Sequence, residues 1–321
     1  MRVLVTGGAG YIGSVVVAQL LADGHEVVVV DDLSTGHADA VPPGAEFHQI
    51  PITALDGRLG DWGIEAAIHF AAKSLVGEST QEPALYWRSN VIGTIAFVDS
   101  LRAYGVDRIV FSSSAATYGD VAEQPITEDA PARPTSPYGA TKLAIDLALR
   151  DYATSYGLAA VSLRYFNVAG ALHTLEGFGY GERHATETHL IPNALRAAMG
   201  SGAELRLFGT DYDTPDGTCV RDYLHVVDLG EAHLSALRAA EPGTHHVINL
   251  GSGTGYSVRE VLTTVGEVAG HEVPVVEAPR RAGDPPRLVA SNARALELLG
   301  WAPTRDLRAM VADAHRFEAR Q

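Results

Sequence analysis

Hydrophobic positions in the first half of the chain fall into short continuous apolar runs, separated by longer stretches with helical spacing. The short runs are rich in β-branched residues, as expected of strands that are covered on both faces of a sheet. The expected strands are residues 3–6, 26–30, 47–50, 66–70, 108–111 and 159–163, and the expected helices are residues 11–22, 83–104 and 138–156. This alternation predicts a parallel sheet with crossover helices.

The pattern changes after residue 166, where glycine-rich loops separate shorter elements. We expect strands at residues 205–208, 223–226 and 246–250, a helix at residues 228–239, a helix that begins after Ser257 and runs toward residue 269, and a helical tail from Asp306. The second and third of these strands are expected to return to the first sheet. The two parts of the chain are therefore expected to be interleaved rather than joined end to end.

Composition and charge narrow the possible partners. The 321 residues include 24 lysines and arginines against 39 aspartates and glutamates, which gives a formal net charge of −15. A uniformly acidic surface repels polyanions, so we expect neither nucleic acid nor an anionic membrane as a partner. Cys219 is the single cysteine, which excludes an internal disulfide and favours a cytoplasmic protein. No apolar run approaches the roughly 20 residues of a membrane span.

A glycine-rich motif lies between the first expected strand and the first expected helix. The sequence GGAGYIG has Gly7, Gly10 and Gly13 at a tight turn, where backbone N–H groups can approach a pyrophosphate at the positive end of the helix. Asp31 ends the second strand, where a carboxylate can accept both ribose hydroxyls of NAD and would repel the 2′-phosphate of NADP. Together these features predict a Rossmann-type, doubly wound α/β domain that binds NAD.

Tyr138 and Lys142 form a Y-x-x-x-K pair at the start of a helix, in a chain with only two lysines. Residues four apart share one helix face, so the ammonium is expected to lie near the phenol and to lower its pKa toward working pH. Ser114 follows a strand in the segment FSSSAATYG, at the sheet edge where open α/β sheets bind ligands. Ser112 and Ser113 compete with Ser114 for the role of active-site hydroxyl.

These residues lie within longer segments that resemble one enzyme family over nearly the whole chain. The segments are VTGGAGYIGS, HFAAKSLVGES, SNVIGT, FSSSAATYGD, SPYGATK, RYFNVAGA, DGTCVRDYLHV and APRRAGD. The chain resembles the UDP-galactose 4-epimerase family of extended short-chain dehydrogenase/reductases. The resemblance implies an isomerase of galactose metabolism that interconverts UDP-galactose and UDP-glucose with a tightly held NAD.

The resemblance implies a catalytic set of Ser114, Tyr138 and Lys142. Tyr138 would take the proton from the sugar 4-hydroxyl while NAD accepts a hydride from carbon 4. The 4-keto sugar would turn over in the pocket, and the hydride would return to its opposite face. Ser114 would hydrogen-bond the reacting oxygen, and Lys142 would hold the nicotinamide ribose and keep Tyr138 acidic.

The same resemblance implies two sets of binding residues. Those around NAD are Gly7, Gly10, Tyr11, Ile12, Gly13, Asp31, Phe70, Ala71, Ala72, Lys73, Asn90, Ser112, Tyr138, Lys142 and Tyr165. Those around the UDP-hexose are Ser114, Tyr138, Asn167, His189, Leu190, Phe208, Arg221, Arg281, Asp284 and Leu288. The NAD-binding domain would span residues 1–166 and about 222–250, and the smaller substrate-binding domain residues 167–221 and 251–321.

The family also implies a homodimer built on the helices at residues 83–104 and 138–156. Apolar residues at helical spacing could form its face, namely Leu85, Ile92, Ile95, Leu143 and Leu147. The alternative is that these side chains only pack on the parent sheet.

Several positions depart from the family pattern. Pro51 stands where an aspartate usually contacts adenine, with Asp56 nearby in the sequence, and Ser74 stands where many members have lysine, one position after Lys73. His189 replaces the asparagine of a substrate-contacting asparagine–leucine pair. None of the 13 histidines forms a pattern such as H-E-x-x-H, so we expect no metal.

One position is implied to set the sugar specificity. A bulky tyrosine there restricts family members to plain hexoses, and a small residue admits N-acetyl sugars. This chain has Leu288, so we expect partial resistance to N-acetyl substrates.

Two other kinds of function remain open at this point. Another nucleotide-sugar epimerase, a dehydratase or a decarboxylase of the same superfamily would use the same fold. Dehydratases carry an Asp–Glu pair directly after the active-site hydroxyl, where this chain has Ala115 and Ala116. A non-catalytic NAD-binding regulator would not need the intact pair of Tyr138 and Lys142.

Overall fold

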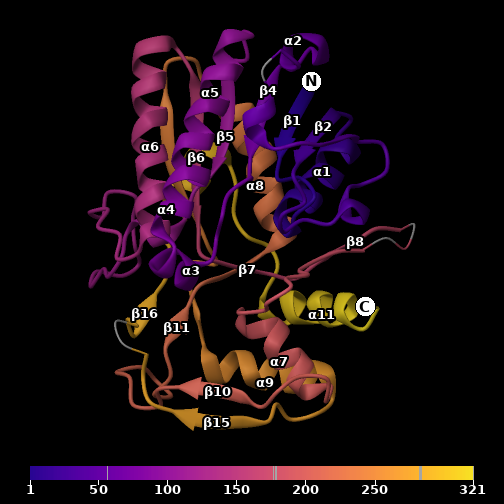
Figure 1. Ribbon diagram of the computed structural model, residues 1–321. Coiled ribbons are helices and arrows are strands. Elements are labelled where there is room, and N and C mark those ends of the chain that lie inside the picture. Colours follow the sequence, from indigo (N-terminus) through magenta and orange to yellow (C-terminus); the bar gives the residue numbers. More distant parts are fainter. Residues whose placement is uncertain (56, 176, 178, 282–283, 321) are drawn as a thin grey trace.

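Seven parallel strands form the central sheet of the computed structural model, which describes residues 1–55, 57–175, 177, 179–281 and 284–320 (Figure 1). In spatial order the strands are β3 (Glu46–Gln49), β2 (Glu26–Asp31), β1 (Arg2–Thr6), β4 (Ala66–His69), β5 (Arg108–Ser112), β6 (Ala159–Tyr165) and β13 (His245–Leu250). Chain order reverses between β1 and β4. The loops that follow these two strands therefore diverge and leave a crevice at the carboxyl edge of the sheet, where ligands bind in open α/β folds.

Helices cover both faces of this sheet. One face packs against α1 (Tyr11–Ala22), α8 (Val226–Ala239) and α10 (Ala293–Leu299), and the other against α2 (Leu59–Trp62), α5 (Gly93–Ala103) and α6 (Pro137–Tyr156). Along β1, Val3 and Val5 join the first of these cores and Leu4 joins the second. Burial on both sides explains why β1 is continuously apolar rather than alternating.

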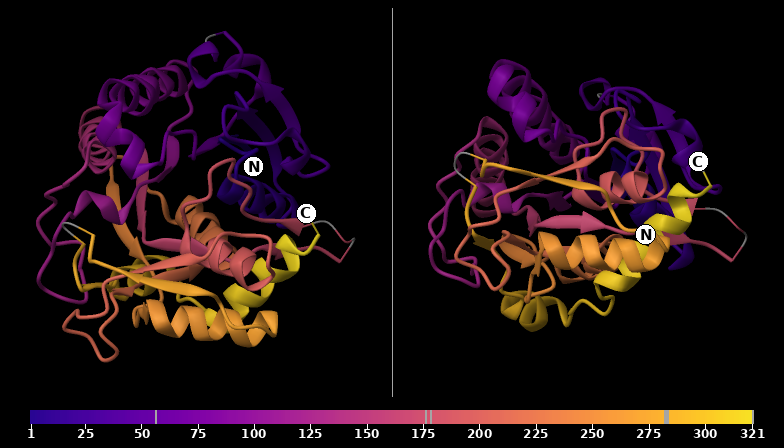
Figure 2. Two further views of the ribbon diagram at one scale, coloured as in Figure 1. Left: turned by 60° about the horizontal axis from the view of Figure 1, so that its bottom comes forward. Right: turned by 90° about the horizontal axis from the view of Figure 1, so that it is seen from below.

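A second, smaller group of elements lies below the sheet in Figure 1 and is seen from beneath in Figure 2. Its strand pairs are β7 (Asn167–Ala169) with β12 (Tyr223–His225), β8 (Leu172–His173) with β9 (Gly179–Tyr180), β10 (Leu205–Phe208) with β15 (Val275–Ala278), and β11 (Val220–Arg221) with both β14 (Tyr256–Ser257) and β16 (Arg287–Leu288). Helices α7 (Leu190–Ala198), α9 (Val258–Ala269) and α11 (Leu307–Glu318) enclose a separate hydrophobic core.

Most of the expected elements occur where the sequence pattern predicts them, and their ends have identifiable causes. The Ser257 hydroxyl accepts a hydrogen bond from the Glu260 N–H and forms a capping box at the start of α9, and Asp306 caps α11. The helix expected at residues 83–104 is present in three consecutive parts: α4 (Pro83–Tyr86), a π-helical segment (Trp87–Ile92) and α5. A further short helix, α3 (Val76–Gln81), precedes them.

The expected return of residues 223–226 to the first sheet is wrong. Strand β13 does pair with β6, but β12 pairs with β7 in a separate two-stranded sheet. Both edges of β6 are already occupied, by β5 and β13, so β12 finds its partner in the continuation of the chain beyond β6. The chain then enters α8 at once, because the His225 ring accepts a hydrogen bond from the Val227 N–H and caps that helix.

Within the described part of the chain, no helix combines the length and the apolar character needed to cross a bilayer.

Candidate active site

A cavity of about 1120 Å³ runs along the carboxyl edge of the sheet and continues between the two groups of elements. Most of the residues expected around NAD and the sugar nucleotide line it. They are Gly7, Gly10, Tyr11, Ile12, Gly13, Asp31, Phe70, Ala71, Ala72, Lys73, Ser112, Ser114, Tyr138, Lys142, Tyr165, Asn167, His189, Arg221, Arg281, Asp284 and Leu288. Asn90, Leu190 and Phe208 are not among the lining residues.

The glycine turn after β1 brings backbone groups to the cavity wall. Gly7 has φ of +73°, and a Cβ atom at this position would lie 2.7 Å from the backbone nitrogen of Ala71. Helix α1 begins after Gly10 without a side-chain cap, so the first N–H groups of the helix are available to an anion. The turn therefore forms a cradle that only glycine permits, as a bound pyrophosphate requires.

Asp31 lies at the end of β2 and is 8% exposed. One carboxylate oxygen accepts from the Ala9 N–H at 3.0 Å and the other from the Leu33 N–H at 2.8 Å. Burial raises the pKa of this carboxyl above its usual value, and the two backbone hydrogen bonds act in the opposite direction. Asp31 is thus held rigidly at the cavity, where it can accept further hydrogen bonds from ribose hydroxyls. The cradle and this acceptor fit NAD.

Ser114, Tyr138 and Lys142 come together in the middle of the cavity. Helix α6 starts here because the Ser136 hydroxyl accepts a hydrogen bond from the Gly139 N–H at 3.1 Å and proline occupies the first helical position. The Ser114 side chain lies beside the Tyr138 phenol and favours its ionised form. One turn further along α6, Lys142 is 2% exposed and its Nζ donates to the Ser112 carbonyl oxygen at 2.7 Å.

The expected lowering of the Tyr138 pKa by Lys142 is not found in the structure. Burial raises the pKa of Tyr138 above its usual value, and the influence of Ser114 only opposes this increase. Lys142 Nζ lies 5.9 Å from the centre of the phenol ring and is directed to the Ser112 carbonyl. Burial also lowers the pKa of Lys142 to about 8, although Asp146 favours its charged form.

The three consecutive serines after β5 have different partners. The Ser113 hydroxyl donates to Asp146 at 3.1 Å, and the Ser112 hydroxyl is hydrogen-bonded to the Tyr165 hydroxyl. Ser113 does not line the cavity, whereas Ser112 and Ser114 do. Ser114 is therefore the serine that lies in the cavity wall beside Tyr138.

A buried ion pair lies beneath this group and was not predicted from the sequence. Arg164 of β6 donates to Asp146 of α6 at 2.9 and 2.8 Å, and both side chains are almost completely buried. The pair fixes α6 against the sheet one turn after Lys142. The pair is hard to predict from the sequence. An arginine within an apolar strand indicates that a partner exists, but this partner lies 18 residues earlier in another element.

Asn90, Leu190 and Phe208 have supporting positions instead of lining the cavity. The Asn90 side chain binds the backbone N–H and carbonyl of Lys73 at 2.8 and 3.0 Å, so it holds the loop that carries residues 70–73. Leu190 packs against the core beneath α7. The Phe208 ring lies beneath the Arg281 guanidinium, whose central carbon is 4.2 Å from the ring centre.

Arg221 and Arg281 line the far end of the cavity. Arg221 pairs with Asp284 and lies beside Leu288, its partner in the register of β11 and β16. The Asn167 amide donates to the Asp222 carbonyl oxygen at 3.0 Å, which fixes the loop after β6 next to Arg221.

The opposite end contains residues that the sequence analysis did not select. They follow β2 and β3, and are Asp32, Ser34, Thr35, Ile52 and Thr53. Pro51 also lines this end, so an apolar ring stands where a carboxylate was expected to meet adenine. Asp56, the nearby alternative, lies outside the described residues.

Comparisons with known proteins agree with this geometry. The family model of the NAD dependent epimerase/dehydratase family matches residues 3–251. A UDP-glucose 4-epimerase of Corynebacterium glutamicum is 51% identical over 319 residues, which cover 99% of this chain and 95% of that protein. The crystal structure of UDP-glucose 4-epimerase from Brucella ovis in complex with NAD has a TM-score of 0.93 at 44% identity, covering 98% of both chains.

A third relative adds a nucleotide ligand. The crystal structure of UDP-glucose 4-epimerase from Bifidobacterium longum in complex with NAD+ and UDP has a TM-score of 0.92 at 34% identity, and covers 100% of this chain and 99% of that one. These matches confirm the resemblance drawn from the sequence segments. With its glycine cradle, its buried lysine and a family match over most of its length, the chain belongs to the NAD dependent epimerase/dehydratase family.

Proposed function

We propose that this chain is a UDP-glucose 4-epimerase, which interconverts UDP-galactose and UDP-glucose through a transient 4-keto sugar. The observation that carries the proposal is the position of Ser114, Tyr138 and Lys142 midway along one cavity. A dinucleotide cradle forms one end of that cavity and two arginines form the other. The full-length relatives that bear this activity support the same conclusion.

NAD is the cofactor, and when bound it supplies the reversible redox chemistry at carbon 4. The glycine turn would hold its pyrophosphate and Asp31 its ribose hydroxyls. Lys142 would donate to the nicotinamide ribose from its buried position. The side chain of Lys73, on the loop held by Asn90, would border the same ribose.

The Tyr138 phenol would accept and return the proton of the sugar 4-hydroxyl. Ser114 lies beside Tyr138, so one proton would be shared between the phenol, the serine hydroxyl and the sugar oxygen that both would contact. Burial raises the pKa of Tyr138 in the absence of ligands, so a nearby positive charge is needed to produce the phenolate. Tyr138 would receive such a charge from oxidised NAD when it is bound, whereas Lys142 Nζ is directed to the Ser112 carbonyl oxygen.

The residues next to Ser114 argue against a dehydratase. Ala115 and Ala116 both line the cavity, and neither can donate or accept a proton through its side chain. The Ser114 hydroxyl accepts a hydrogen bond from the Ala116 N–H at 3.1 Å, which fixes the alanines beside the reacting position. Elimination of water would need an acid and a base there, whereas epimerisation does not.

The arginine end of the cavity suits the UDP group. Arg221 and Arg281 can form charge-assisted hydrogen bonds with the diphosphate. Phe208, beneath Arg281, offers an aromatic surface near the uracil. Asp284 holds Arg221 in place until the diphosphate provides a second partner.

We also propose a homodimer in the cytoplasm. Of the five apolar side chains expected on the dimer face, none is buried in the single chain; they are Leu85, Ile92, Ile95, Leu143 and Leu147. Ile92 is 64% exposed and Leu147 44% exposed, whereas Phe97 and Ile145 on the same helices pack into the core. A single buried cysteine suits a reducing compartment.

Replacement of Tyr138 tests the assigned acid–base group. Tyr138→Phe is expected to lower kcat by about 10²- to 10⁴-fold, because the general acid–base contribution is lost. The variant should still contain NAD, measured in the supernatant after denaturation. Tyr156→Phe, on the exposed end of the same helix, is the matched control and should keep full activity. Near-normal activity of Tyr138→Phe would show that another group moves the proton.

Replacement of Lys142 separates stability from function. The lowered pKa of about 8 means that the ammonium destabilises the fold at pH 7 by about 3 kcal/mol, at about 1.4 kcal/mol per pKa unit. Lys142→Met relieves this cost but leaves the Ser112 carbonyl without its donor, which costs about 1–3 kcal/mol. Epimerase activity should fall at least 100-fold, at about 1.4 kcal/mol of lost stabilisation per tenfold. The free energy of unfolding, from urea titration without NAD, should stay unchanged or rise by up to about 2 kcal/mol.

The difference in the free energy of unfolding between Lys142→Met and the unmodified chain should change with pH in one direction. Between about pH 8 and the usual lysine pKa near 10.5, the unfolded chain holds the Lys142 proton and the folded chain does not. The free energy of unfolding of the unmodified chain should therefore rise with pH over this window, relative to that of Lys142→Met. Any excess stability of the variant at pH 7 should become smaller as the pH rises. This account would be contradicted if Lys142→Met had a much lower free energy of unfolding than the unmodified chain at pH 7 and approached it as the pH rises.

Leu288 is the residue that we expect to limit N-acetyl substrates. An acetamido group that meets the leucine side chain overpacks the site at a cost of about 1–3 kcal/mol, roughly a 5- to 150-fold preference. UDP-galactose and UDP-glucose should react efficiently and their N-acetyl forms several-fold less well, compared by kcat/KM. Leu288→Ser should narrow that ratio. An unchanged ratio would remove Leu288 from this role.

The dimer is tested by light scattering at micromolar concentration. The measured mass should be twice the chain mass of 34.0 kDa. Ile92→Asp combined with Leu147→Asp should give monomers, because two charges cannot be buried unpaired in an apolar interface. Leu296→Asp, at an exposed leucine of α10 that is 60% exposed, is the control and should leave the dimer intact. A monomeric mass for the unmodified chain would reject the proposal.

A further inference from the structure

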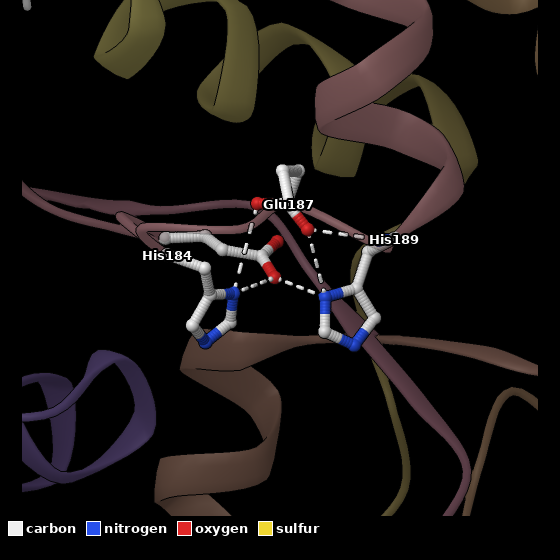
Figure 3. A group of neighbouring side chains, drawn as sticks. His184, Glu187 and His189 are labelled. Carbon is white, nitrogen blue, oxygen red and sulfur yellow. Dashed lines mark hydrogen bonds and ion pairs between the residues drawn. The ribbon is translucent and has the colours of Figure 1, made fainter. Parts of the chain in front are cut away.

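Two histidines and two glutamates converge on the segment between β9 and α7. They are Glu182, His184, Glu187 and His189, and each offers one ligand atom within 4.8 Å of the others. Figure 3 shows His184, Glu187 and His189 of this group, with their side chains directed toward one another. The spacing is E-x-H-x-x-E-x-H, which differs from the helical H-E-x-x-H pattern considered in the sequence analysis. Here an irregular loop brings the four side chains together, an arrangement that the helical pattern does not cover.

Each imidazole Nδ1 of this cluster lies near two carboxylate oxygens but can donate only one proton. His184 Nδ1 lies 3.0 Å from Glu182 Oε1 and 3.6 Å from Glu187 Oε2. His189 Nδ1 lies 2.5 Å from the same Glu182 oxygen and 3.1 Å from Glu187 Oε1. Each Nδ1 carries at most one hydrogen, so it can satisfy one carboxylate oxygen well but not two. Glu187 Oε2 is buried and has no hydrogen bond.

A tetrahedral metal ion accounts for the same spacing. With metal–ligand distances near 2.0–2.1 Å, neighbouring ligand atoms lie roughly 3.3–3.4 Å apart. The four nitrogen–oxygen separations, from 2.5 to 3.6 Å, lie on both sides of that value, and all four ligand atoms lie within 4.8 Å of one another. Small side-chain rotations would therefore bring two nitrogens and two oxygens to coordination distance around one centre.

The burial of the two carboxylates also favours a bound cation. The Glu182 and Glu187 side chains are only 7% and 2% exposed, so their negative charges need compensation close by. A divalent cation held between the two carboxylates and the two imidazoles would supply this compensation.

We propose that Glu182, His184, Glu187 and His189 bind one divalent transition-metal ion, with zinc preferred. Two imidazoles with two carboxylates in a tetrahedral arrangement suit Zn²⁺ better than Mg²⁺ or Ca²⁺, which favour six or more oxygen ligands. All four coordination positions come from the protein, as in structural zinc sites. The ion is therefore structural, and no reaction step passes through it.

The position of the cluster gives the ion a mechanical consequence. Arg183, between two of the ligands, donates to Asp39 at 3.0 and 2.7 Å, and His37 Nε2 lies 2.9 Å from the Arg183 carbonyl oxygen. We call this contact between residues 37–39 and 182–184 the bridge. Residues on both sides of it line the cavity at its dinucleotide end. By fixing residues 182–189, the ion holds the bridge closed and slows the release of NAD, a consequence that rests on the proposed function.

Metal content of the untagged full-length chain tests the site itself. After growth with added zinc and gel filtration, elemental analysis should find about one zinc per chain. Protein stripped with a chelator should melt at a lower temperature, and Zn²⁺ but not Mg²⁺ should restore the melting temperature. Co²⁺ added to the stripped protein should give the intense visible absorption of tetrahedral cobalt. Less than about a tenth of an ion per chain together with no cobalt absorption would overturn the proposal.

Variants identify the ligands. His184→Gln and Glu187→Gln should each lose most of the bound zinc. His48→Gln is the matched control, because His48 Nε2 pairs with one carboxylate, Glu46, at 2.8 Å outside the cluster; it should keep its zinc. Equal zinc in all four proteins would mean adventitious binding and would overturn the assignment. If the cluster variants fail to fold, the cobalt spectrum of the unmodified chain decides.

Retention of NAD tests the bridge separately from metal binding. In chelator-treated protein and in His184→Gln, the NAD retained after gel filtration should fall several-fold relative to the zinc-loaded chain. Bound zinc with no effect on NAD retention would overturn the role of the bridge but not the metal site. A chain that binds zinc but no NAD would contradict the proposed function instead.

Discussion

Close backbone contact at the carboxyl ends of β1 and β4 sets the position of the groups in the cavity. A Cβ atom at Gly7 would lie 2.7 Å from the Ala71 nitrogen, and one at Gly13 would lie 2.2 Å from the Gly7 carbonyl oxygen. Any larger residue would separate the turn from the loop after β4. That loop is held from its other side by Asn90, which also contacts Thr141 of α6. The dinucleotide cradle and the helix that carries Tyr138 are thereby linked through a few hydrogen bonds and two glycines.

The centre of the site combines charges that burial disfavours. Lys142 is held by one carbonyl oxygen, and Arg164 is paired with Asp146 one helical turn away. Such groups add little net stability, because the loss of hydration offsets much of their attraction. Their value is positional: a buried ammonium with a single acceptor has a defined direction and is already desolvated when the cofactor and sugar arrive. The free energy lost by removing these charges from water is confined to the reacting centre. The apolar burial in the surrounding sheet offsets it.

Much of the fold follows from local sequence patterns, and much of the site from two motifs. Continuous apolar runs predict the strands of the central sheet, while Ser257 and Asp306 indicate where helices begin. Long-range relations were harder to predict. The partner of β12 depends on which edges of β6 are free, and the role of Asn90 depends on a loop 17 residues away in the sequence. The E-x-H-x-x-E-x-H cluster gave no signal because no regular helix or strand relates its four ligands.

The order of the elements has a consequence for how the molecule can move. The chain leaves the central-sheet part after β6, returns at α8 and leaves again after β13; it returns once more at α10 and leaves again for α11. Five separate connections therefore join the two parts on either side of the cavity. A hinge motion is absorbed by a few residues in such connections. Here all five would have to bend together, which restricts wide opening of the molecule. Substrate and product must therefore pass through rearrangements of surface loops, while the two main bodies stay together around a cofactor that has no need to leave.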